Sequence, residues 1–392
     1  MLYENTWQQV PLCDATEILD CLRKPVNSKE RNSRISGKSQ SELFPYYGAT
    51  GQVGWIDDYI TDGEFVLLGE DGAPFLDAFS EKAYIISGET WVNNHAHVLK
   101  SKTSNKFLCY YLNSFNFKGY VSGTTRLKLT QAEMKRIPVP VPPLAEQERI
   151  VARIEELFSQ LDAGVETLKK TKAQLAVYRQ AVLKEAFERI KKDSVLCNVE
   201  DICKEIKVGI VIKPAQYYTS SDKGVRAFRS ANVREFSVND SDWVYLTKDG
   251  HKANLRSEIH SGDVLVVRSG YPGTACVVPP TFDGSNAIDI LIAVPNNEKI
   301  LSEYLCAYTN SPLGRRIVQE KKRGVAQAHF NVSGYSKTPI IVPCLETQKR
   351  VVAEIESRLS VCDSIEQTVD TALQQAEAMR QSVLKKAFEG EL

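Results

Sequence analysis

The chain has 392 residues, of which 43% are hydrophobic and 25% are charged, a composition typical of a folded protein with two or three domains. This composition excludes an intrinsically disordered chain. The 49 Lys and Arg residues balance the 49 Asp and Glu residues, so the chain has no net positive charge. This excludes a protein that binds nucleic acid through its overall charge. A binder whose charge is arranged locally stays compatible with these numbers.

We expect a cytoplasmic protein without membrane attachment. The first seven residues contain neither the basic patch nor the apolar run of a signal peptide, and every apolar stretch is too short to cross a bilayer. The nine cysteines include no C-x-x-C pair, which favours reduced core thiols over a disulfide framework or a zinc site.

Residues 1–143 are predicted to form a first globular segment of mixed α/β structure. Short runs of β-type residues at 65–68 and 83–86 predict strands separated by Gly-containing turns, and 106–113 predicts a helix. Residues 51–99 of this segment hold nine acidic residues and one Lys, so charge is unevenly distributed within it.

Residues 144–192 are predicted to form one long helix, which begins after a proline-rich stretch. Apolar residues recur at alternating spacings of four and three, which indicates a narrow coiled-coil seam. A helix of 45 residues extends about 68 Å. The seam residues expected here are Ile154, Leu161, Leu168, Leu175 and Val182.

Residues 193–344 and 345–392 repeat this arrangement. At a constant offset of 201 residues, 19 of the 45 positions from 144 to 188 are identical in the second copy, which indicates an internal duplication. The second globular segment has predicted strands at 264–267, 288–294 and 339–342 and a predicted helix at 302–309. The seam residues expected in the second helix are Ile355, Cys362, Val369, Ala376 and Val383.

These elements predict an α+β fold of four domains, 1–143, 144–192, 193–344 and 345–392. Two mixed α/β domains related by pseudo-two-fold symmetry would be joined and spaced by two long antiparallel coiled-coil helices. The intervening segment is long enough to bring the chain back on itself. In the alternative arrangement, each helix pairs with a second copy of the chain.

The sequence carries little that predicts catalysis. It contains no phosphate-binding G-x-x-x-x-G-K-[ST] loop and no strand-linked G-x-G-x-x-G. Two E-x-K tripeptides, at 133–135 and 205–207, match half of a nuclease motif and are frequent by chance. His95 and His97 have a spacing found in metal sites, but their alternation with apolar residues favours a strand.

Basic residues instead gather at equivalent places in both halves. Residues 100–136 hold eight Lys and Arg and one acid, and residues 304–337 hold six and one. A Gly-led loop at 122–128 aligns with 323–329, and such loops can contact phosphates and base edges. The DNA contacts expected from these stretches are Lys100, Lys102, Lys106, Thr124, Thr125, Arg126, Lys128, Lys321, Lys322, Arg323, Gln327 and His329.

Within these loops, Arg126 suits a guanine edge and Gln327 an adenine edge. Further expected contacts are Tyr46 and Tyr47 in the first segment, and Arg226, Arg229, Asn232, Arg268 and Tyr271 in the second. Because these loops diverge while the helices are kept, the two segments should recognise different sequences of double-stranded DNA. For any single residue, the alternative is a solvated loop without a ligand.

Four features carry a resemblance to a known family. They are Pro-Val-Pro-Pro-Leu-Ala-Glu-Gln-Glu-Arg-Ile-Val at 140–151, its second copy at 343–352, the two Val-Leu-Lys-x-Ala-Phe-Glu helix ends at 182–188 and 383–389, and Tyr46–Gly51 with Glu70–Ala73. In this pattern the chain resembles the specificity (S) subunits of type I restriction–modification systems. The second copy departs from the family pattern at Cys344 and Thr347.

The resemblance implies a non-catalytic subunit in which each target-recognition domain reads one half of a bipartite, asymmetric DNA site. The helices would set the gap between the halves and dock two methyltransferase subunits, which motor-nuclease subunits join. S-adenosylmethionine, ATP and Mg²⁺ would belong to those partners, with no cofactor on this chain. Two alternatives stay open: an independent nuclease or methyltransferase, and a coiled-coil scaffold without DNA specificity.

Overall fold

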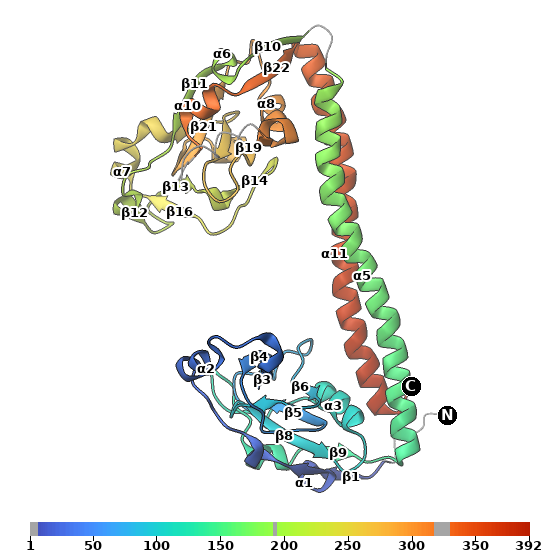
Figure 1. Cartoon of the computed structure of the whole chain (residues 1–392). Helices are drawn as coiled ribbons and strands as arrows, with labels where there is room; N and C mark the ends of the chain where they lie inside the picture. The colour runs from blue at the N-terminus through green and yellow to red at the C-terminus, as the bar shows by residue number, and fades with distance from the viewer. Residues whose placement is uncertain (1–6, 191–193, 317–329) are drawn as a thin grey trace. The chain divides into compact units, whose positions relative to one another are not determined.

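The computed structural model describes residues 7–190, 194–316 and 330–392 and divides the chain into two compact units. Unit 1 comprises residues 1–170 and 369–392, and unit 2 comprises residues 171–368. Two helices of 45 residues, α5 (Leu144–Glu188) and α11 (Leu345–Glu389), each contribute one part to both units. Each unit therefore contains one globular segment and a stretch of both long helices (Figure 1).

The globular segment of unit 1 contains nine short strands and four helices among its described residues. In chain order these are β1 (Gln9–Pro11), α1 (Leu12–Ala15), β2 (Thr16–Ile18), α2 (Ser28–Ile35), β3 (Phe44–Gly48), β4 (Gly51–Ile56), β5 (Phe65–Gly69), β6 (Ala83–Ile86), β7 (Trp91–Val92), β8 (Ala96–Ser101), α3 (Asn105–Ser114), α4 (Gln131–Lys135) and β9 (Pro138–Pro140).

The central sheet of unit 1 is antiparallel and has the order β2-β8-β5-β6. Every residue of β5 is buried, and helix α3 packs against the sheet through Leu108 and Leu112. The Ser104 side chain caps α3 by accepting a hydrogen bond from the Phe107 N–H. A smaller sheet, β4-β3-β7, and the pair β1-β9 complete the segment.

The globular segment of unit 2 follows the same plan with more strands. Its elements are β10 (Ser194–Asn198), α6 (Val199–Ile202), β11 (Cys203–Val208), β12 (Tyr218–Thr219), β13 (Val225–Phe228), β14 (Val233–Arg234), β15 (Ser237–Val238), β16 (Val244–Leu246), α7 (Lys248–Ala253), β17 (Glu258–Ile259), β18 (Val264–Val267), β19 (Ala275–Val277), β20 (Ser285–Ala287), β21 (Ile290–Pro295), α8 (Ser302–Asn310), α10 (Val332–Ser336) and β22 (Pro339–Pro343).

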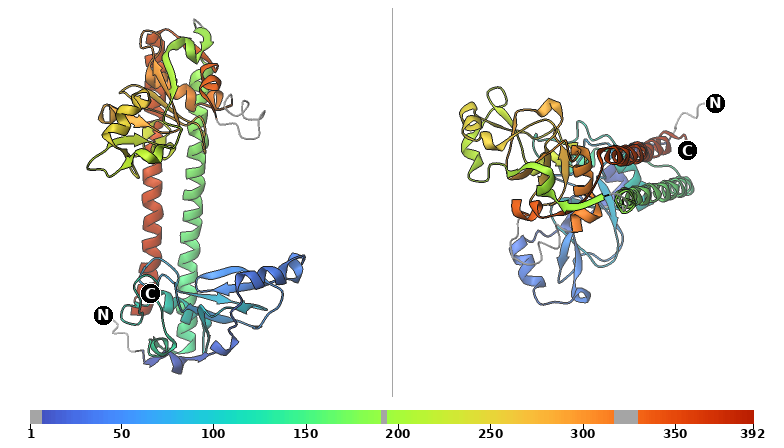
Figure 2. Two further views of the ribbon diagram at one scale, coloured as in Figure 1. Left: turned by 90° about the vertical axis from the view of Figure 1, so that its left-hand side faces the viewer. Right: turned by 90° about the horizontal axis from the view of Figure 1, so that it is seen from above.

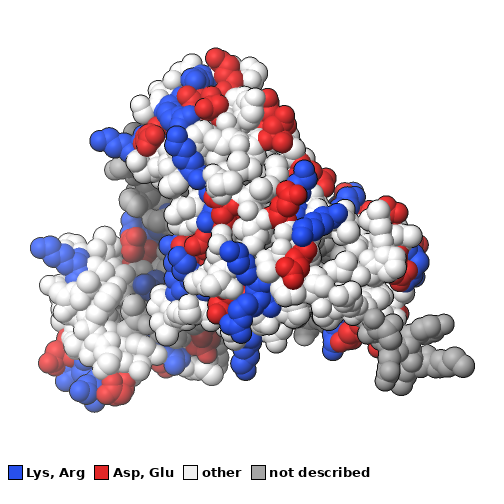
Figure 3. All heavy atoms as spheres, turned by 90° about the horizontal axis from the view of Figure 1, so that it is seen from below, with Lys and Arg blue, Asp and Glu red and all other residues white. Residues whose placement is uncertain are grey.

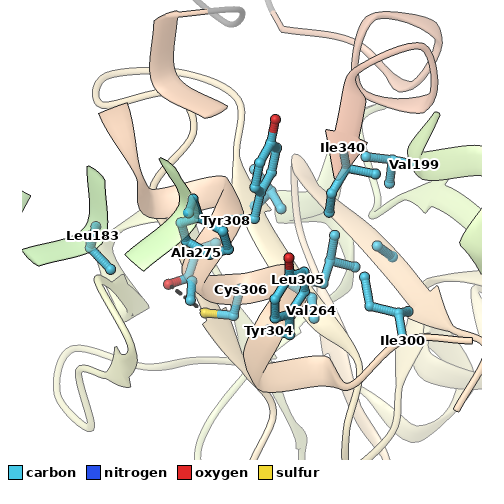
Figure 4. Close-up of a cluster of buried hydrophobic side chains, with 14 of the residues drawn as sticks. Leu183, Val199, Val264, Ala275, Ile300, Tyr304, Leu305, Cys306, Tyr308 and Ile340 are labelled. Carbon is cyan, nitrogen blue, oxygen red and sulfur yellow. Dashed lines mark hydrogen bonds between the residues drawn. The ribbon is translucent and has the colours of Figure 1, made fainter. Parts of the chain in front are cut away.

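The central sheet of unit 2, β11-β21-β18-β19, has the same antiparallel pattern as β2-β8-β5-β6, and β10-β22 corresponds to β1-β9. Its core gathers Val264, Tyr304 and Leu305 around α8, as Figure 4 shows, together with the Cys306 thiol, which lies 3.4 Å from the Ala275 carbonyl oxygen. The second sheet differs, because five strands, β12-β16-β13-β20-β17, replace the three of unit 1. The cores are thus alike and the outer sheets are not.

Equivalent hydrogen bonds confirm the duplication. The hydroxyl of Tyr111 donates to the Pro138 carbonyl in unit 1, as that of Tyr308 does to Pro339 in unit 2. Gln147 Nε2 donates to the Pro142 carbonyl over 2.9 Å, and Gln348 makes the same bond to Pro343 over 2.9 Å. These glutamines anchor the starts of α5 and α11, which explains their place in the repeated sequence.

The long helices pair with each other in antiparallel orientation. In unit 2 the Arg179 guanidinium of α5 lies 2.6 Å from Asp363 and 2.9 Å from Glu366 of α11, and in unit 1 Arg380 of α11 pairs with Asp162 of α5. Figure 2 shows the two helices side by side. The chain therefore uses its own second helix as the coiled-coil partner, rather than that of a second copy.

Each helix ends against the other globular segment. Phe187 near the end of α5 contacts Tyr304 and Tyr308 of α8, and Phe388 near the end of α11 contacts Phe107 and Tyr111 of α3, with ring centroids 5.2–5.3 Å apart. The phenylalanine of each repeated Ala-Phe-Glu end thus packs its helix against the globular segment that does not immediately precede that helix in the sequence.

The ten residues expected in the coiled-coil seam are all buried or half-buried. Ile154 and Val182 are fully buried and Cys362 is nearly so. The α+β class, with two mixed segments and two long antiparallel helices, is confirmed. Within the described parts of the chain, none of the helices has the length and apolar character of a membrane span.

Candidate nucleic-acid interface

The Gly-led loop 122–128 of unit 1 is fastened to the segment that follows β5. The Gly72 N–H donates to the Leu127 carbonyl over 2.9 Å, and Ser122 and Lys128 exchange backbone hydrogen bonds of 2.8 and 3.0 Å. Gly123 adopts φ +103°, and a Cβ there would lie 2.3 Å from the Arg126 carbonyl oxygen. The loop therefore requires glycine at this position, and its tip presents exposed Thr124, Thr125 and Arg126.

Acidic side chains hold the basic residues of this loop. The Arg126 guanidinium lies 2.8 Å from Asp71, and Lys128 Nζ lies 3.1 Å from Glu70. Burial alone would raise the pKa of Glu70, but hydrogen bonds from Arg23 and Lys128 outweigh it and hold this pKa below its ordinary value. The site is thus not an open basic patch. It consists of the ion pairs Arg126–Asp71 and Lys128–Glu70, which we call the charge ladder.

A network of buried polar side chains adjoins the charge ladder, because Arg23 pairs with both Asp20 and Glu70. His97 Nδ1 lies 2.8 Å from Asp20, and its Nε2 lies 3.1 Å from the Leu129 carbonyl oxygen. Burial would raise the pKa of Asp20, but hydrogen bonds from His97, Gln131 and the Val98 N–H lower it overall.

The two histidines of this region make different contacts. His97 lies in β8, as the strand interpretation predicts, whereas His95 lies just before that strand and its Nδ1 is 2.6 Å from Asp71. Among the described residues no group of three or more His, Cys, Asp and Glu side chains could hold a metal ion.

The structure separates the predicted basic stretch into two places. Lys100 is near the end of β8, and Lys102 Nζ donates to the Asp14 carbonyl over 2.7 Å. Lys106 Nζ lies 2.7 Å from Glu155 of α5. Since the loop 122–128 meets the opposite end of this six-residue strand, roughly 17 Å lie between the two groups. These lysines and the loop do not form one continuous site.

Two of the expected DNA contacts, Tyr46 and Asn232, have buried side chains. Tyr46 is 2% exposed, and its hydroxyl lies within hydrogen-bonding distance of the Val26 backbone. Asn232 is fully buried and donates to the Ser241 carbonyl over 2.9 Å. Both side chains stabilise the fold of their segments. Tyr47 is half-buried against Tyr84.

Three of the arginines predicted in unit 2 are engaged within the protein. Arg226 lies over the rings of Trp243 and Phe282, at 5.1 and 5.3 Å from their centroids. Arg229 pairs with Asp242. The Arg268 side chain is only 13% exposed, pairs with Asp289 at 2.5 Å and donates to the Phe330 carbonyl.

Among the predicted contacts of unit 2 that the structure describes, Tyr271 is the most exposed, at 85%. Its loop borders a cavity of about 750 Å³. Two arginines outside the set of expected contacts, Arg234 and Arg315, line the same cavity, and Arg315 pairs with Glu235. Charge counting alone could have identified them as candidates. Lys321, Lys322, Arg323, Gln327 and His329 lie outside the described residues.

Positive and negative charges are mixed on the face of the described residues drawn in Figure 3, where Lys and Arg side chains are interspersed with Asp and Glu. The ion-pair partners of Arg126 and Lys128, which charge counting did not assign, are the acidic residues Asp71 and Glu70. These two acids lie directly after the buried strand β5, within the Glu70–Ala73 stretch that carries part of the resemblance.

Comparison with known proteins shows similarity to one family. Residues 4–177 match the model of the type I restriction modification DNA specificity domain. A type I restriction enzyme specificity subunit of Haemophilus influenzae is 27% identical over 386 residues, which are 95% of this chain and 92% of that protein. The EcoKI specificity subunit of Escherichia coli is 26% identical over 309 residues, which are 73% of this chain and 65% of that protein.

Solved structures show the same fold. A chain from a structure of the type I R-M system, concerned with its assembly and conformational transition, superimposes with a TM-score of 0.72 at 16% identity and 98% coverage of both chains. The HsdS subunit of Thermoanaerobacter tengcongensis gives a TM-score of 0.52 at 16% identity, covering 99% of this chain and 98% of that one. Over nearly its whole length the chain is thus similar to type I restriction–modification specificity subunits, and residues 4–177 match the DNA specificity domain of that family.

Proposed function

We propose that the chain recognises a bipartite, asymmetric DNA site, with each globular segment reading one half. The observation that carries this proposal is a shared core with divergent surfaces. The central sheets have the same strand order, whereas the outer sheets have three strands in unit 1 and five in unit 2. Two copies of one framework with different exposed loops suit the recognition of two different sequences.

The charge ladder of unit 1 gives this recognition a physical basis. Arg126 and Lys128 are exposed cations held by acids, so they offer donors in fixed places without a large positive field. In unit 2, Tyr271, Arg234 and Arg315 border one cavity. Since half or more of protein–DNA hydrogen bonds go to the backbone, a nearly neutral chain should bind DNA weakly and with strong salt dependence when alone.

The paired helices would set the distance between the two half-sites. Each helix has 45 residues, and ion pairs fix their antiparallel register in both units. A coiled coil of defined register is a stiff spacer, unlike a flexible linker. The spacer of the DNA site would then follow from helix length.

The same helices are the proposed docking platform for two methyltransferase subunits, which motor-nuclease subunits would join. On the helices of unit 2, Val177 is 71% exposed and Val361 is 59% exposed. Exposed apolar side chains of this kind suit contact with a partner protein. S-adenosylmethionine, ATP and Mg²⁺ would be bound by the partners. This chain would position the complex while a partner flips an adenine for methylation.

A segment exchange tests the division of labour. The chain is co-expressed with its cognate methyltransferase subunit, and methylated sites are mapped before and after residues 1–143 are replaced by those of another family member. The original chain should give a split motif with a fixed gap, and the exchange should change one half only. No motif, or two changed halves, would contradict the proposal.

A further inference from the structure

Arg126 combines exposure with a fixed orientation. Its side chain is 61% exposed at the tip of the loop 122–128, yet its Nη2 donates to Asp71 Oδ1 over 2.8 Å. Among the described residues, Asp71 is the only side chain that pairs with it. A guanidinium has five N–H donors in a rigid fork, so several donors remain directed toward solvent.

Asp71 is itself held in place. His95 Nδ1 lies 2.6 Å from the same Oδ1 atom that Arg126 contacts. Because an ionised carboxylate only accepts hydrogen bonds, His95 must carry its hydrogen on Nδ1. The backbone of Asp71 forms a β-bridge with Lys128, which joins the acid to the loop that it supports.

The neighbouring glycine leaves space for the guanidinium. Gly72 adopts φ +71°, and a Cβ built there would lie 3.1 Å from Arg126 Nε. A side chain at this position would therefore crowd the arginine as well as strain the backbone. Asp71 and Gly72 together restrict the position of the Arg126 guanidinium.

Lys128 provides the contrast within the same loop. It pairs with Glu70, which also pairs with Arg23 in the buried network. A lysine ammonium is a point charge suited to phosphate, whereas a pre-oriented guanidinium can bond guanine O6 and N7 together. The two acid–base pairs thus suit different parts of DNA.

We propose that Asp71 is a positioning residue that presents Arg126 to one guanine of the half-site read by the first globular segment. The inference rests on the proposed function and deepens it by assigning one base to one residue pair. An acid near DNA normally repels phosphate, and here Arg126 and His95 screen it. Asp71 therefore acts through the arginine and does not contact the base.

The test maps methylation by the complex of this chain with its cognate methyltransferase subunit. In Asp71→Asn and Arg126→Lys, methylation should spread to sites with other bases at one guanine of the first half-site, reducing discrimination there about tenfold or more. The second half-site and the gap should not change. Arg126→Ala should relax the same position, and adding Asp71→Asn to it should have little further effect.

Arg136→Ala is the matched control, because Arg136 is an exposed arginine paired with Glu133 at 3.0 Å outside this loop. It should leave the motif intact. A half-site without guanine, an unchanged motif in Asp71→Asn, or an equal loss of methylation at all sites would overturn the inference. If the unaltered chain gave no split motif, the proposed function itself would fail, which is a separate result.

Discussion

At the scale of the residue, acids decide how the cations of unit 1 are presented. The basic character of the loop 122–128 could be predicted from the sequence by counting charges. The partners Glu70 and Asp71 could not be assigned in this way, because they lie more than fifty residues away and meet the loop only through β5. Residue type also failed to distinguish exposed Arg126 from buried Asn232, since both are polar residues in loop-like sequence.

Asp20 gives a prediction about pH. Its folded-state pKa is lowered from the ordinary value of 3.8, so its carboxylate contributes stability that is complete well above that value and is lost as the pH falls through the folded-state pKa. Asp20→Asn should lower the local free energy of unfolding by about 1.5–3 kcal/mol at pH 7. The difference from the original chain should shrink near pH 3.

Amide hydrogen exchange in β8 at both pH values measures this effect, because Asp20 accepts a hydrogen bond from the Val98 N–H. Asp58→Asn is the control, since this exposed aspartate bonds only to the adjacent Tyr59 N–H among its described hydrogen bonds. An equal difference at pH 7 and pH 3 would show that the carboxylate charge is not what stabilises the strand.

At the scale of the element, periodicity predicts structure well where packing repeats regularly. The heptad pattern and the prolines locate both long helices, and the strands at 65–68, 83–86 and 264–267 agree with β5, β6 and β18 within one residue. The outer sheets could not be predicted. Their strands are short, and parallel pairs such as β3 with β7 join residues 45 positions apart, such as Tyr46 and Trp91.

The helix ends give a prediction about each unit separately. Phe187 is 1% exposed against α8, so Phe187→Ala should destabilise unit 2 by about 3–5 kcal/mol through the cavity that it creates. Hydrogen exchange should rise in α8 and not in α3. Phe388→Ala, which is half-buried against α3, should show the reverse pattern with a smaller effect.

Val177→Ala is the control on the same helix, because Val177 is 71% exposed and its loss should change stability by less than about 0.5 kcal/mol. Equal destabilisation of both units by either phenylalanine variant would indicate that the helix ends do not belong to separate cooperative units.

At the scale of the whole molecule, the duplication is consistent with the proposal that a neutral chain binds DNA selectively. Charge is paired locally within each unit, so under the proposed function specificity would rest on oriented side chains rather than on net charge. The repeat, the element order and the family could be predicted from the sequence because duplication leaves a constant offset. The recognised bases could not, because they depend on loop geometry that differs between the units.

The central claim is that the globular segments read DNA and the helices set the spacing. Its most direct test inserts one heptad after Gly164 in α5 and one after Glu377 in α11, near the level at which Asp162 pairs with Arg380. Whole heptads keep the seam in phase and lengthen the coiled coil by about 10.5 Å. At 3.4 Å per base pair, the spacer should grow by about three base pairs. Methylation mapping should show that longer gap with both half-sites unchanged, whereas altered half-sites or an unchanged gap would contradict the account.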